Sequence, residues 1–242
     1  MSGPGLLLLA TAVLGGAAAQ RVTGLGFALV ASPFLVLLLG PFHGVLLANA
    51  LSLLTNLLVL CFTWRDVAVR KVVLLSLPAL VMVVPGAWIA HHLNTAVLMV
   101  LVGTVIVVAL LTVSFVPRAR VLRGGRGAVV AGGMSGFMNA SAGVGGPAIT
   151  LYAVSTDWEH REFVGSMQLY FAVLNAASLA AKGGVPDLAL PAALTALAAL
   201  AAGSAAGHWL TRRIPVRWAR AATTSLAVLG ATATTAKGLA AL

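Results

Sequence analysis

The sequence predicts an all-α integral membrane protein made of two inverted repeats, each a broken, re-entrant helical hairpin followed by three transmembrane helices. The first indication is composition: of 242 residues, 60% are hydrophobic and 8% are charged, whereas a soluble domain carries about 25% charged residues. The second is a series of apolar runs of bilayer length. The third is a pair of glycine-containing interruptions, one in each half of the chain.

Apolar runs of about 20 residues are long enough to cross a hydrocarbon core of about 30 Å. We expect full spans over 44–63, 72–91, 95–116, 162–181, 188–211 and 217–242. Two further elements are interrupted, one of them made of the pieces 6–22 and 27–39 and the other covering 128–155. The chain is therefore expected to have about 8 to 10 membrane segments.

The second interrupted element contains the stretch Ala131–Ser155, AGGMSGFMNASAGVGGPAITLYAVS. Gly143, Gly145, Gly146 and Pro147 disfavour a continuous helix, because glycine adds backbone freedom and proline lacks a donor. Broken backbone at membrane depth persists only where protein or a water-filled cavity covers it. Such breaks near the midplane form the substrate sites of many transporters.

Matching residues in the two halves indicate an internal duplication. Asn49 and Gln168 are 119 residues apart, and so are Asn56 and Asn175. Several matching pairs that occur in the same order in both halves are typical of an internal repeat. The expected organisation is a first transmembrane repeat over 1–116, a basic linker over 117–127 and a second repeat over 128–242.

The basic residues predict the topology. The formal net charge is +10, but Lys and Arg lie mainly in short loops between apolar runs, which favours membrane orientation over nucleic-acid binding. If both broken elements return to the side they entered from, 12 of the 15 basic residues fall on one face, in the loops 64–71, 117–127, 157–161 and 211–220. This face is expected to be cytoplasmic. Three crossings per half then invert one repeat relative to the other.

The N-terminal segment has two interpretations. Its Ala17-Ala18-Ala19 end is similar to a signal-peptidase site, but no Lys or Arg precedes the apolar run. Because the first repeat needs this segment, we favour its retention.

Two segments of the second half, SGFMNASAGVGGPAITLYAVS and EFVGSMQLYFAVLNAAS, resemble the TauE/SafE family of sulfite exporters, and the likeness covers essentially the whole chain. In the first half, GLGFALVASP has fewer glycines than that family usually has. The resemblance implies transport of sulfite, sulfonates or other small organic anions across a bacterial inner membrane.

Candidate substrate-binding residues are polar or helix-breaking positions near the two breaks and on the helices that follow. Backbone N–H groups at a helix start bind oxyanions, and amides donate to sulfonate or carboxylate oxygens without the cost of a buried charge. The set is Arg21, Thr23, Gly24, Ser32, Asn49, Ser52, Asn56, Asn139, Ser141, Gly143, Gly145, Gly146, Pro147, Gln168 and Asn175. Helix packing is the alternative explanation for the glycines and amides.

Arg21 also has two interpretations. An arginine at membrane depth is a functional hypothesis by default, so it could attract the anion. If the first hairpin is longer and reaches the cytoplasm, Arg21 is one more orientation signal.

The five acidic residues all lie in turns or at span ends, so the usual carboxylate site for a proton or sodium ion is missing and an anion is the favoured substrate. No cofactor, metal or nucleic-acid partner is expected, and no enzymatic activity, because no span places a base beside a nucleophile. The expected partners are a small anion and the lipid bilayer, with a second copy of the chain as a candidate. An anion channel and a non-transporting scaffold are the alternatives to a permease.

Overall fold

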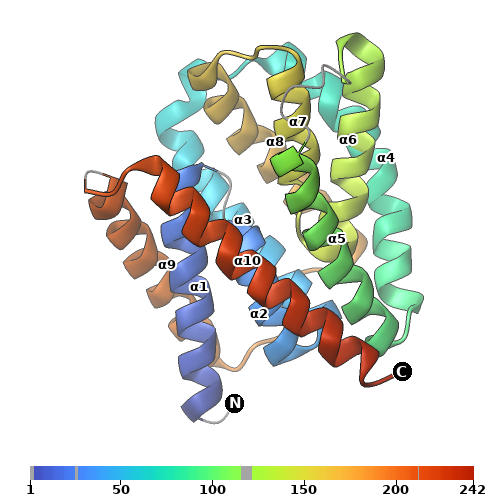
Figure 1. The fold of residues 1–242 in the computed structure, drawn as a ribbon, viewed down its shortest axis with the longest axis vertical. Coiled ribbons are helices and arrows are strands. Elements are labelled where there is room, and N and C mark those ends of the chain that lie inside the picture. Colours follow the sequence, from blue (N-terminus) through green and yellow to red (C-terminus); the bar gives the residue numbers. More distant parts are fainter. Residues whose placement is uncertain (1–2, 25–26, 116–121, 212) are drawn as a thin grey trace. The chain divides into compact units, whose positions relative to one another are not determined.

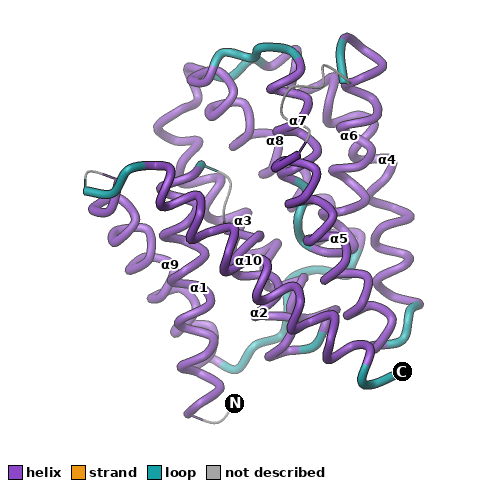
Figure 2. Tube along the Cα trace, viewed as in Figure 1, coloured by secondary structure: helices purple, strands orange, loops and turns teal. Residues whose placement is uncertain are grey.

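The computed structural model describes residues 3–24, 27–115, 122–211 and 213–242. Within these ranges the regular structure is entirely helical, with no strand (Figures 1 and 2). The helices are α1 (Gly3–Thr23), α2 (Phe27–Leu39), α3 (Pro41–Thr63), the 3-10 helix η1 (Trp64–Asp66), α4 (Val69–His92), α5 (Thr95–Phe115), α6 (Gly124–Ala142), α7 (Gly146–Ser155), α8 (His160–Ala181), α9 (Leu190–Thr211) and α10 (Val216–Leu239).

In the described part of the chain, five helical segments are long and apolar enough to cross a membrane: α1, α3 together with η1, α4, α8 and α9. The apolar helices α2 and Thr95–Leu111 are shorter. The predicted fold class, an all-α multi-pass membrane protein, is confirmed.

The two predicted interruptions are also found in the structure. In the first half α1 ends at Thr23 and α2 begins at Phe27, and in the second half α6 ends at Ala142 and α7 begins at Gly146. Most helices begin or end within three residues of the predicted spans. The first part of the basic linker, with Arg118 and Arg120, lies outside the described residues.

The chain divides into two compact units, each made from both halves of the sequence. Unit 1 contains 1–51, 93–107 and 185–242, and unit 2 contains 52–92 and 108–184. The predicted repeats concern duplication along the sequence rather than these spatial units, and their boundaries stay a prediction.

In unit 1, α1 packs against α2 and α9. Its buried core includes Leu9, Val13, Phe27 and Leu35, whose side chains are at most 1% exposed. On α9, Gly203 lies directly on the α1 backbone at Leu14. The missing side chain at this position allows the two helices to approach closely.

In unit 2, α4 packs against α6 along a line of glycines. A Cβ on Gly132 would collide with the carbonyl oxygen of Leu75, and a Cβ on Gly136 would collide with that of Ala79. A glycine of α4 makes the same kind of contact with α6: a Cβ on Gly86 would lie 2.8 Å from the carbonyl oxygen of Phe137. The backbones of α4 and α6 are thus in direct contact.

Candidate functional site

The break between α6 and α7 is fixed by a glycine in the left-handed conformation. Gly143 has φ +77°, and its N–H donates to the carbonyl oxygen of Asn139 at 2.9 Å, which caps α6. Gly145 is the N-cap of α7, and Pro147 lies in the first turn, where a proline loses no helical hydrogen bond. The predicted break is therefore confirmed, and its residues terminate one helix and begin the next.

Replacing Gly143 by alanine is expected to lower the free energy of unfolding by about 1–2 kcal/mol, because a Cβ is disfavoured in the left-handed region. Thermal unfolding in detergent measures this effect. The control is Gly125→Ala, near the start of the same helix, where a Cβ would meet no atom within 4 Å. Equal melting temperatures for both variants and the wild type would contradict the prediction.

The helices α6 and α7 form a hairpin whose two outer ends meet. The Nε–H of Arg123, immediately before α6, donates to the carbonyl oxygen of Ser155, the last residue of α7, at 3.1 Å. With ten residues, α7 is about 15 Å long. The chain thus enters through α6 and returns to the same end of unit 2 through α7, as predicted for this element.

Two buried hydroxyl groups lie beside the start of α7. A Cβ on Gly145 would be 2.6 Å from Ser135 Oγ on α6. The Ser135 hydroxyl lies beside that of Tyr170, half-way along α8. Both side chains are fully buried, and neither hydroxyl makes a hydrogen bond of ordinary geometry to a described residue. The start of α7 therefore adjoins polar groups with unused hydrogen-bonding capacity.

Asn139 joins α6 to α8 a few residues before the break. Its Nδ2 donates to Asn175 Oδ1 at 3.0 Å, and its Oδ1 accepts from Ser178 Oγ at 2.8 Å. The three side chains are at most 2% exposed. Because both ends of the Asn139 amide are used, this group holds α6 and α8 in register.

Lys182 lies at the end of the same line of residues. It is the first residue after α8 and only 4% exposed, and its Nζ donates to the carbonyl oxygen of Ala140 on α6 at 3.0 Å. Neither of the two ion pairs in the described part of the chain, Lys71–Glu162 and Arg161–Asp66, involves it. Burial lowers the pKa of Lys182 to about 7. The lysine is thus a buried basic group without a carboxylate partner among the described residues.

These residues form a continuous set, which we call the polar column. It begins beside the start of α7, passes the Asn139 amide and ends at the lysine. Its members are Ser135, Asn139, Tyr170, Asn175, Ser178 and Lys182.

Of the six members, Asn139 and Asn175 belong to the predicted candidate set, and Ser178 lies on the predicted polar stripe of Gln168 and Asn175. Ser135, Tyr170 and Lys182 are not among the candidates, and Lys182 falls just outside the predicted span 162–181. A signal was nevertheless present: Gln168, Asn175 and Lys182 are seven residues apart, so they share one helix face.

The other predicted residues of the second half lie close to the column with different partners. Gln168 Nε2 donates to the carbonyl oxygen of Val164 at 3.2 Å, and its buried Oε1 accepts no hydrogen bond from a described residue. Ser141 Oγ donates within its own helix, to the carbonyl oxygen of Phe137 at 2.7 Å.

The predicted residues of the first half are divided between the two units. Arg21 is exposed in the last turn of α1, Thr23 Oγ1 donates to the carbonyl oxygen of Ala19 at 2.8 Å, and Gly24 turns the chain with φ +87°. All three belong to unit 1. The four predicted polar residues of α2 and α3 are buried, with Ser32 and Asn49 in unit 1 and Ser52 and Asn56 in unit 2.

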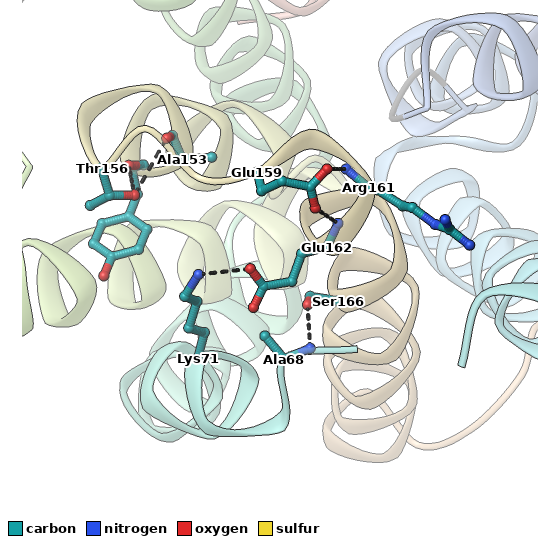
Figure 3. A network of polar contacts seen from close by, with 9 residues as sticks. Ala68, Lys71, Ala153, Thr156, Glu159, Arg161, Glu162 and Ser166 are labelled. Carbon is teal, nitrogen blue, oxygen red and sulfur yellow. Dashed lines mark hydrogen bonds and ion pairs between the residues drawn. The ribbon is translucent and has the colours of Figure 1, made fainter. Parts of the chain in front are cut away.

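A second polar network lies where α8 begins (Figure 3). Lys71 Nζ pairs with Glu162 at 3.1 Å, and the backbone N–H of Ala68 donates to Ser166 Oγ at 2.9 Å. The Glu159 carboxylate caps α8 by accepting from the N–H groups of Glu162 and Arg161, which hold the Glu159 pKa below its usual value. These contacts fasten the start of α8 to the start of α4, at the end of α8 opposite Lys182.

The described geometry defines a class of protein: a multi-pass helical membrane protein with a helical hairpin, α6–α7, and a buried polar column beside its break. The sequence model of the family "Sulfite exporter TauE/SafE" matches residues 8–234. The chain belongs to this family of membrane transporters, as its resemblance predicted. No curated protein and no solved structure shows a significant match to the chain.

Proposed function

We propose that the protein is a permease for small oxyanions, such as sulfite, organosulfonates or small carboxylates. The observation that carries this proposal is the position of Lys182. A basic group that is 4% exposed, without a carboxylate partner in the described residues, is costly unless a charge of opposite sign joins it. We propose that the transported substrate supplies that charge.

The neighbouring groups suit an oxyanion. Ser135 and Tyr170 carry buried hydroxyls with hydrogen-bonding capacity to spare, and hydroxyls donate well to sulfonate or carboxylate oxygens. The start of α7 adds the positive end of a helix dipole. Among the described members of α6, α7 and α8, carboxylates occur only near the start of α8, at the opposite end from Lys182.

We propose further that two inverted repeats give alternating access to this site. Support comes from matching contacts in the two units. A Cβ on Gly86 would lie 2.9 Å from the Cβ of Ala140, and a Cβ on Gly203 would lie 2.9 Å from that of Ala17. The same pairing of a glycine with an alanine on a hairpin helix is expected if the halves arose by duplication. By the positive-inside rule, the arginine-rich loops face the cytoplasm of a bacterial inner membrane.

Transport by the purified protein in proteoliposomes tests the proposal. Saturable uptake that is stimulated by anion loaded on the opposite side indicates a carrier, and voltage-driven conductance indicates an anion channel. If both activities are absent, the protein is a non-transporting scaffold. Sulfite, methanesulfonate and acetate are suitable probes. Absence of flux for all three would refute the permease.

Three variants test the site within this assay. Asn139→Ala and Gln168→Ala are expected to reduce flux, because they remove amides beside the break. Arg21→Ala separates the two interpretations of that residue: reduced flux at unchanged topology favours anion attraction, and altered topology with normal site function favours an orientation signal.

A further inference from the structure

The buried polar side chains of α6 and α8 near Lys182 are uncharged. The group nearest to its Nζ in the hydrogen-bond network is the carbonyl oxygen of Ala140, near the end of α6, where the helix dipole is negative. The adjoining side chains of the column are amides and hydroxyls. A neutral amine can also donate to this carbonyl, because it still carries N–H donors, although its hydrogen bond is weaker than that of an ammonium.

We propose that Lys182 takes up one proton when an oxyanion binds, so that the anion and a proton cross the membrane together. This inference rests on the permease function proposed above and adds the coupling ion. The reason is electrostatic: an ammonium buried among neutral groups is unfavourable, and the arriving anion removes that penalty.

Protonation of Lys182 on anion binding needs no reactant other than water and the anion. Above neutral pH the side chain in the empty site is a neutral amine; on binding, the amine nitrogen, a proton from water and the anion give an ammonium ion paired with the anion. One N–H bond forms on binding and breaks on release. For a monovalent anion the complex that crosses is electrically neutral, and for a divalent anion it carries one negative charge.

Because Lys182 is buried, its pKa lies near neutral pH. Desolvation lowers the pKa of Lys182 to about 7, so the empty site gains or loses its proton near neutral pH. Binding of a proton and binding of an anion then favour each other by the same factor. Above pH 7 the anion affinity is expected to fall by about tenfold per pH unit.

On the helices that pack around Lys182, the other titratable side chains are exposed or lie farther from it along the helix. His91 and His92 lie at the exposed end of α4, and Tyr170 lies about three turns before Lys182 on α8. The charged residues at the start of α8, their partners on η1 and α4, and Arg126 at the start of α6 all lie at the opposite end of these helices.

Binding of methanesulfonate between pH 6 and pH 9 tests the proposal, because the charge of this probe stays constant over that range. For the wild type we expect the dissociation constant to rise about tenfold per unit above pH 7. Lys182→Arg, which stays protonated, is expected to bind with little pH dependence. Lys182→Met keeps the apolar stem without the basic group and is expected to lose binding.

Proton uptake gives an independent readout. In weakly buffered detergent solution at pH 8, a pH indicator should report nearly one proton taken up per methanesulfonate bound by the wild type, and none by Lys182→Arg. Methanesulfonate binding without proton uptake and without pH dependence would overturn the coupling and leave the permease intact. Lack of binding and flux for methanesulfonate, sulfite and acetate would overturn both.

Thermal stability without anion shows whether Lys182→Met folds and whether the lysine is neutral when the site is empty. The folded state binds fewer protons than the unfolded state between pH 7 and the usual lysine pKa of 10.5, so stability rises with pH over this range. We expect the wild-type melting temperature to increase from pH 7 to pH 9. Lys182→Met should lack this increase, and an equal slope in both proteins would contradict the proposal.

Discussion

Replacing Asn139 by aspartate is expected to lower oxyanion flux on the order of 100-fold. The substitution keeps the size of the side chain and adds a negative charge next to Ala140, the residue that anchors Lys182. At a separation of about 6 Å and an effective dielectric constant of about 20, repulsion of a bound anion is about 3 kcal/mol. The new carboxylate also faces Asn175 Oδ1, which then loses its donor.

Initial rates of sulfite or methanesulfonate uptake into proteoliposomes measure this effect. The matched control is Asn94→Asp, the same substitution at an exposed position. Asn94 Oδ1 accepts from the N–H of Val97 at the start of α5, and an aspartate there keeps this cap. Elution of both variants as folded protein, with undiminished uptake by Asn139→Asp, would show that no anion passes near Asn139.

The second large effect is expected for Gly136→Ala, which should destabilise unit 2. A Cβ at this position collides with the backbone of Ala79 on α4, and backbone cannot turn away as a side chain can. Overpacking typically costs about 1–3 kcal/mol, and rigid surroundings place this variant at the upper end. The expected decrease in melting temperature is roughly 10 °C, measured by tryptophan fluorescence in detergent.

Gly133→Ala is the control on the same helix. Its Cβ would meet only Met82 Cγ, at 3.4 Å, and a methionine side chain adapts readily. We expect this variant to melt within a few degrees of the wild type. Equal losses in both variants would mean that the backbone contact with Ala79 does not account for the loss at Gly136, since alanine by itself favours the helix.

Much of the fold could be predicted because each of its signals is local. A run of apolar residues such as 72–91 contains enough information to indicate a span, and α4 covers Val69–His92. The break followed from the chemistry of Gly143 and Pro147, which act on their own backbone. Pairing of distant helices could not be predicted in this way, because the glycines that allow α4 to meet α6 look the same as glycines in any membrane helix.

The candidate site was only partly predictable for a related reason. Asn139 and Asn175 were found because amides are unusual in apolar stretches. Lys182 stands beside Gly183 and Gly184, where a lysine is normally solvated, and its burial depends on the contact with Ala140. Ser135 gave no signal, because serine is common in membrane helices. The position of Tyr170 in the middle of a span, away from the interface where tyrosine is common, was a signal that was not used.

The interleaved composition of the two units has a consequence for biosynthesis. During synthesis α4 leaves the ribosome before α6, its partner in unit 2, and α1 leaves it long before α9, its partner in unit 1. A nascent chain released before residue 124 therefore has no complete unit. Membrane insertion must keep the early helices apart from other proteins until their late partners arrive, so we expect slow translation of the second half to increase degradation of the whole chain.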